Sequence, residues 1–106
     1  MSAIQASEIV EVFRQALRGE IAVKVEGDES WDKIYCGDVE FMFGEWRIVV
    51  FNDCSEFDYV SSALAPDGRE GEFDDWWPGS PVDMLTMEEL AAMENLVESL
   101  EPEVRA

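Results

Sequence analysis

The pair Gly44-Glu45 separates two segments in which apolar residues occupy alternate positions. A Gly-X pair at such a place favours a tight type II′ turn between antiparallel strands. This turn sets the register and brings three apolar pairs onto one sheet face, Phe43 with Trp46, Phe41 with Ile48, and Val39 with Val50. Because the turn and the alternation agree, we predict a β-hairpin of residues 34–43 and 46–52 with one apolar face.

An N-terminal helix is predicted from apolar residues at helical spacing, which are Ala6, Ile9, Val10, Phe13, Ala16 and Leu17. Ser2 with Gln5, as a capping box, or Ser7 marks its start. Gly19 is the expected residue just past its end.

A C-terminal helix is predicted after Thr86, which forms a capping box with Glu89. Its apolar stripe consists of Leu90, Met93, Leu96, Val97 and Leu100. Pro102 ends it.

The remaining segments complete an antiparallel meander. Residues 21–25 and 57–65 are predicted strands, residues 66–69 a turn, and residues 70–73 a short edge strand. Residues 26–32 and 75–81 are predicted loops. The expected fold class is α+β, an antiparallel β-meander of three to five strands with an N-terminal and a C-terminal helix on one face. The 106 residues suffice for one core, so residues 1–106 are expected to form a single domain.

The charge balance constrains the partners. Twenty-five acidic residues face seven basic ones, for a net charge of −18. Such a field repels nucleic acids and anionic membranes and attracts basic proteins and cations. The alternative is acidity that serves only solubility or salt adaptation. Histidine is absent, which excludes histidine-based triads. We find neither a membrane span nor a secretory signal at the N-terminus, and expect a cytoplasmic protein without a cofactor.

The acidic excess is concentrated towards the C-terminus. The segment from Glu70 to Val104 holds eleven acids and no base. On the second helix the carboxylates opposite the apolar stripe are Glu88, Glu94, Glu98 and Glu101. Acids three and four positions apart destabilise a helix slightly, which suggests that they have a use. We interpret them as a surface that meets basic groups; the alternative is an ordinary solvated helix face.

Two tryptophans follow two acids in the segment Asp74-Asp75-Trp76-Trp77. Tryptophan is enriched at the energetic centres of interfaces. We expect Trp76 in the core and Trp77, which precedes a Pro-Gly turn, partly exposed as an interface anchor. Asp74 and Asp75 would join the binding surface.

Further carboxylates and the two cysteines give weaker indications. Asp53, Glu56 and Asp58, with Asp38 and Glu40 nearby, are candidate cation ligands or a candidate pair for glycoside hydrolysis. Because a chain this acidic brings carboxylates together by chance, we expect neither a metal site nor an enzyme. Cys36 and Cys54 are expected as two reduced thiols, since a disulfide would require a bulge between them.

Three segments carry a family resemblance: residues 30–40 (SWDKIYCGDVE), residues 51–59 (FNDCSEFDY) and residues 66–69 (PDGR). They resemble a group of short bacterial proteins known only as a domain of unknown function. The resemblance spans the middle half of the chain and implies a bacterial or mobile-element origin. It implies no catalytic residue, cofactor or partner.

The function expected from these observations is binding. We expect a small acidic protein that covers a basic surface of a partner protein, such as a nucleic-acid-binding protein or nuclease. An inhibitor, an immunity protein and an anti-defence protein, including one that mimics nucleic acid, all fit. The first alternative is a structural or interaction module of unknown ligand; the second is a carboxylate- or metal-dependent enzyme.

Overall fold

A computed structural model describes residues 4–26, 30–34, 36–54, 56–76 and 80–100. Its elements in chain order are α1 (Ala6–Leu17), β1 (Val23–Val25), η1 (Trp31–Lys33), β2 (Cys36–Phe43), β3 (Trp46–Asp53), β4 (Glu56–Leu64), β5 (Glu70–Glu72), α2 (Phe73–Trp76), η2 (Pro81–Met84) and α3 (Met87–Glu98), where η denotes a 3₁₀ helix. The five strands form one antiparallel sheet in the order β1-β2-β3-β4-β5. The α+β meander is therefore confirmed.

The predicted hairpin register is confirmed along its whole length. Phe43 pairs with Trp46 and Cys36 with Asp53, at the two ends of the ladder. Gly44 has a φ of +61°, the left-handed conformation that glycine adopts without a steric cost. Trp46 differs from the prediction in being only half-buried, because it lies beside the turn at the sheet end, where it lines a surface pocket together with residues of α1.

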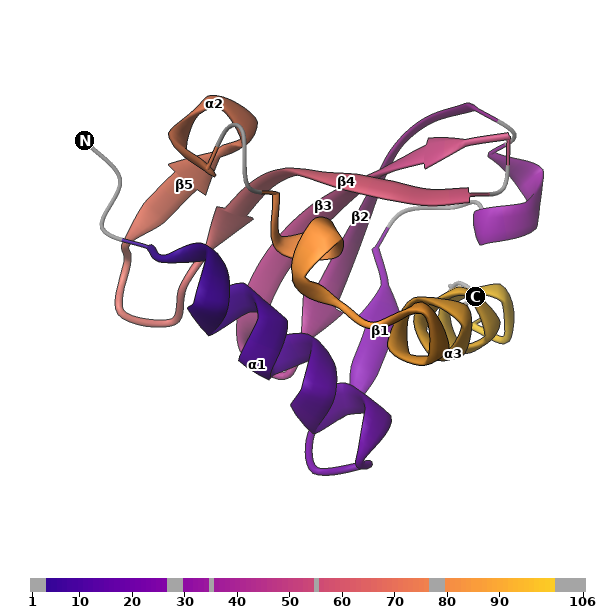
Figure 1. Ribbon diagram of the computed structural model, residues 1–106, viewed down its shortest axis with the longest axis horizontal. Coiled ribbons are helices and arrows are strands. Elements are labelled where there is room, and N and C mark those ends of the chain that lie inside the picture. Colours follow the sequence, from indigo (N-terminus) through magenta and orange to yellow (C-terminus); the bar gives the residue numbers. More distant parts are fainter. Residues whose placement is uncertain (1–3, 27–29, 35, 55, 77–79, 101–106) are drawn as a thin grey trace, which may run out of the picture.

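The helices α1 and α3 lie over the same face of the sheet (Figure 1). The buried side chains of this layer are Ile9, Phe13 and Ala16 of α1 and Met93 and Val97 of α3, against Val39, Phe41, Phe43, Ile48, Val50, Phe57 and Val60 of the sheet. Phe13 is central, with its ring centroid 5.3 Å from that of Phe43 and 5.5 Å from that of Phe57, both edge-on. Edge-on rings add stability beyond the area they bury.

The loop predicted over residues 26–32 is wrong at its end, where Trp31 begins the 3₁₀ helix η1 and belongs to the core. Trp31 of η1 is fully buried, and its ring lies 5.9 Å from Phe41 and 6.0 Å from Phe57. Asn52, also fully buried, donates its amide N–H groups to the backbone carbonyls of Trp31, at 3.0 Å, and of Ile34. A buried amide with these partners joins η1 to the sheet.

The helix ends test the capping predictions. Thr86 Oγ1 accepts from the Glu89 backbone N–H at 3.0 Å, and Glu89 Oε1 accepts from the Thr86 N–H at 2.9 Å, as predicted. The predicted start of α1 at Ser2 or Ser7 is wrong, because the N-cap is Gln5. Its backbone N–H donates to the Glu8 carboxylate at 3.0 Å. Ser2 lies outside the described residues.

The edge strand predicted over residues 70–73 forms as β5, but Phe73 and the first residues of the loop predicted over 75–81 belong to a short helix, α2. Phe73 begins α2, and the Asp75 carboxylate accepts from the Glu72 backbone N–H at 2.8 Å, which stabilises this turn. Trp76 is buried and donates its indole N–H to the Ile4 carbonyl at 3.1 Å. Its predicted place in the core is confirmed.

Candidate functional site

The predicted acidic residues lie on α2 and α3. Asp74, Asp75, Glu88 and Glu98 are exposed to solvent. Glu94 is half-buried and accepts a hydrogen bond from the backbone N–H of Phe57 at 3.1 Å. It therefore ties α3 to the start of β4 as well as adding charge. Trp77 and Glu101 lie outside the described residues.

The arginines of the described residues lie on or beside α1, on β3 and in the turn before β5. Arg18 pairs with Glu11 at 2.9 Å and with Glu20 at 2.5 Å, and Arg69 pairs with Glu8 at 3.0 Å and Asp67 at 2.8 Å.

Arg47 pairs with Glu40 at 3.0 Å on the hairpin, and Arg14 bridges α1 to Glu89 of α3 at 2.8 Å. These arginines therefore neutralise acids of α1, of the hairpin, of the Asp67 turn and of the first turn of α3. In the ranges that the structure describes, the exposed carboxylates Asp74, Asp75, Glu88 and Glu98 form no ion pair with an arginine, and the first two, on α2, lie at the other end of the molecule from the last two, on α3 (Figure 1).

Glu89 consequently differs from the other helix acids. Hydrogen bonding from Arg14, and then from the Thr86 backbone N–H, lowers its pKa to about 2. It closes the helix cap and joins the two helices, so we assign it a structural part.

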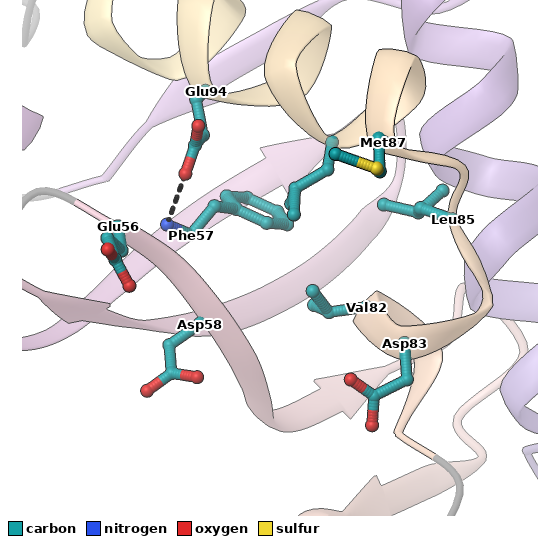
Figure 2. A pocket seen from close by; sticks show the side chains of 9 residues that line it. Glu56, Phe57, Asp58, Val82, Asp83, Leu85, Met87 and Glu94 are labelled. Carbon is teal, nitrogen blue, oxygen red and sulfur yellow. Dashed lines mark hydrogen bonds between the residues drawn. The ribbon is translucent and has the colours of Figure 1, made fainter.

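A groove of about 460 Å³ lies between the start of β4, η2 and the first turns of α3 (Figure 2). Its apolar lining consists of Phe57, Val82, Leu85, Met87 and Leu90, and its carboxylates are Glu56, Asp58, Asp83 and Glu94. Figure 2 shows that these side chains come from three segments that are distant in sequence. Apolar groups with a few polar ones at a concave site are typical of binding sites.

A β-bulge shapes one side of the groove. The register of β3 with β4 passes from the Asn52–Phe57 pair directly to the Phe51–Tyr59 pair, which makes Asp58 an extra residue. Bulges redirect side chains and recur beside functional sites. As a result Phe57 points into the core while Tyr59 stacks on Phe51 on the opposite face, at 5.0 Å.

The carboxylates around Asp58 influence one another. Partial burial raises the pKa of Asp58, and the nearby charges of Asp53 and Asp83 raise it further. The candidate cation ligands named from the sequence are not gathered into one cluster, since within the described residues no group of three acids, cysteines or histidines is placed to hold a metal ion. Asp38 instead accepts from Ser61 Oγ at 2.7 Å, and Glu40 pairs with Arg47.

Cys36 and Cys54 are free and exposed thiols. Cys36 lies opposite Asp53, as predicted, and Cys54 follows at the turn with a φ of +53°.

A family model described as "Domain of unknown function (DUF7693)" matches residues 3–99, which is most of the chain. The chain belongs to the DUF7693 family. No curated protein and no solved structure matches it. The resemblance seen in the sequence is thereby confirmed at the level of a family without an assigned function. No helix in the described part of this DUF7693 member is long and apolar enough to cross a membrane.

The groove of this DUF7693 protein is not predictable from the sequence. There the carboxylates of β4 are only candidate ligands or hydrolase residues, and those of α3 form a separate candidate surface. The sequence offers one signal for the site, Met87 directly after the cap residue Thr86, and the structure leaves this methionine 89% exposed. A single methionine at such a position is an ordinary surface residue, so the signal is weak.

Proposed function

We propose that this protein binds and covers a basic surface of a partner protein, in the manner of an inhibitor, an immunity protein or an anti-defence protein. The observation that carries the proposal is the uneven distribution of charge. Arginines pair with acids of α1, with Glu40 of the hairpin and with Glu89 of α3, whereas α2, η2 and the rest of α3 present carboxylates with no lysine or arginine in the same stretch of sequence.

Charge of this kind acts before contact. It raises the association rate with a basic surface, and the effect weakens with ionic strength. A partner that binds nucleic acid, including a nuclease, has such a surface, so nucleic acid would compete with this protein. The free thiols of Cys36 and Cys54 favour action in the cytoplasm, where thiols stay reduced.

The test begins with the partner that co-purifies at low ionic strength and is then made with purified components. The double reversal Glu88→Lys with Glu98→Lys is preferable to one that includes Glu94, because Glu94 also binds the Phe57 backbone. The matched control reverses Glu26 and Glu45, which are exposed and belong to the β1–β2–β3 part of the sheet. Both variants change the net charge equally.

We expect the α3 reversal to slow association on the order of tenfold at low salt, more than the control does, with the difference shrinking as salt rises. Equal rates for the two variants would contradict the proposal. So would a recovered partner whose contact surface is neutral or acidic.

A further inference from the structure

The groove between β4, η2 and α3 combines an apolar lining with an uncovered apolar side chain. Leu85 and Leu90 are half-buried in its wall, whereas Met87 is 89% exposed at its edge. Met84, three residues earlier on η2, is 47% exposed but lies outside the groove lining. Flexible, polarisable methionine side chains are frequent at surfaces that bind other proteins. This apolar strip is therefore suited to an apolar side chain supplied from outside.

Carboxylates surround that strip. Glu56 and Asp58 come from β4, Asp83 from η2 and Glu94 from α3 (Figure 2). In the described part of the chain none of the four forms an ion pair. Partial burial, and then the charges of Asp53 and Asp83, raise the pKa of Asp58, and a cation placed between Asp58 and Asp83 would relieve that repulsion. The charge of the groove thus selects a positively charged occupant.

The size of the groove limits that occupant. About 460 Å³ lies within the range of roughly 300–1,000 Å³ that holds a molecule of drug size. Such a space accommodates a few side chains and not a whole helix. The occupant is therefore a short segment, and its basic side chain must also contact apolar surface along its stem.

We propose that this groove binds an arginine side chain, together with an adjacent apolar side chain, of a short segment on the surface of the partner protein. Arginine fits better than lysine because its guanidinium offers five donors to several carboxylates, stays charged, and loses less hydration. Its stem lies on Leu85 and Leu90, and the apolar neighbour contacts Met87. The inference rests on the proposed function and adds its short-range anchor.

The binding probe is a short synthetic peptide in which leucine and arginine alternate. Two contrast probes separate the contributions: the same peptide with neutral citrulline in place of arginine, and spermidine, which carries charge without apolar side chains. Titration followed by amide chemical shifts locates binding. We expect the arginine peptide to shift Phe57, Val82, Met87 and Leu90 and the two contrast probes to bind about tenfold more weakly or not at all.

Two variants with matched controls test the geometry. Met87→Ser removes the apolar edge, and Met84→Ser is its control outside the groove lining. Asp83→Asn removes a groove charge, and Glu45→Gln makes the same charge change at the exposed turn of the β2–β3 hairpin. The exposed positions let all four fold, and we expect only the groove variants to weaken peptide binding by about tenfold.

Several results would overturn the inference: shifts that lie elsewhere, equal binding of spermidine or the citrulline peptide, or groove variants that behave as their controls. If these occur while the Glu88 and Glu98 reversal still slows association with the partner, the groove inference fails and the proposed function stands. If the peptide occupies the groove but the partner's contact surface is neutral, the proposed function fails instead.

Discussion

Replacing Asn52 by alanine tests how η1 and its buried tryptophan are held. The side chain donates hydrogen bonds to the carbonyls of Trp31 and Ile34 from a position with no solvent exposure. Each buried bond contributes about 0.5–1.5 kcal/mol, and a carbonyl left without its donor costs about 1–3 kcal/mol. Trp31 O keeps a bond from the Ile34 N–H at 3.3 Å, so the penalty falls mainly on Ile34 O. We expect a loss of about 2–4 kcal/mol in the free energy of unfolding.

Urea and thermal denaturation followed by circular dichroism measure this loss. In a domain of this size it corresponds to a fall in Tm of roughly 10–30 °C. The matched control is Asn95→Ala on the exposed face of α3, which should be neutral or slightly stabilising because alanine favours helix. An Asn52→Ala protein that unfolds at the same midpoint as Asn95→Ala would refute the idea that this amide joins η1 to the sheet.

Three further predictions concern stability. Ile48→Ala should lower the free energy of unfolding by about 2–5 kcal/mol, because shortening this fully buried side chain leaves a cavity in the core. An unchanged urea midpoint would contradict the packing described. Salt raised from low to physiological strength should increase the Tm, since a net charge of −18 repels itself; a decrease would indicate favourable pairs or bound cations. The pKa of Glu89 is lowered from 4.5 to about 2, so its ionisation stabilises the fold above about pH 4.5 and that stability is lost as the pH falls through 2. Acid titration should therefore cost the wild type more stability than Glu89→Gln over this interval, and equal losses would show that the Arg14 pair contributes nothing.

Local sequence patterns predicted the β2–β3 hairpin and the start of α3 correctly. Gly44-Glu45 agrees with the alternation on either side, and Thr86 with Glu89 forms the cap that its spacing indicates. In such places the local preference and the tertiary structure favour the same answer.

Features that depend on contacts between distant segments escaped prediction. Trp31 stands among acidic and polar neighbours without apolar periodicity, so its burial depends on Asn52, which is far along the chain. The groove likewise needs β4, η2 and α3 to meet, and the bulge at Asp58 is set by the pairing of β4 with β3. Of the predicted interface residues, Glu88 and Glu98 are on the surface as expected, while the hydrogen bond of Glu94 to β4 could not be foreseen.

The strand order has a consequence for how the chain folds during synthesis. Because each strand pairs only with its neighbours in sequence, every ladder can close as soon as its second strand leaves the ribosome. The helix α1 is made first, yet one of its ion-pair partners, Glu89, is made near the end. We therefore expect the nascent sheet to form on α1 early. The part of the sheet face that Met93 and Val97 of α3 cover then stays open until α3 docks. The groove, whose wall is α3, is then completed in that last step.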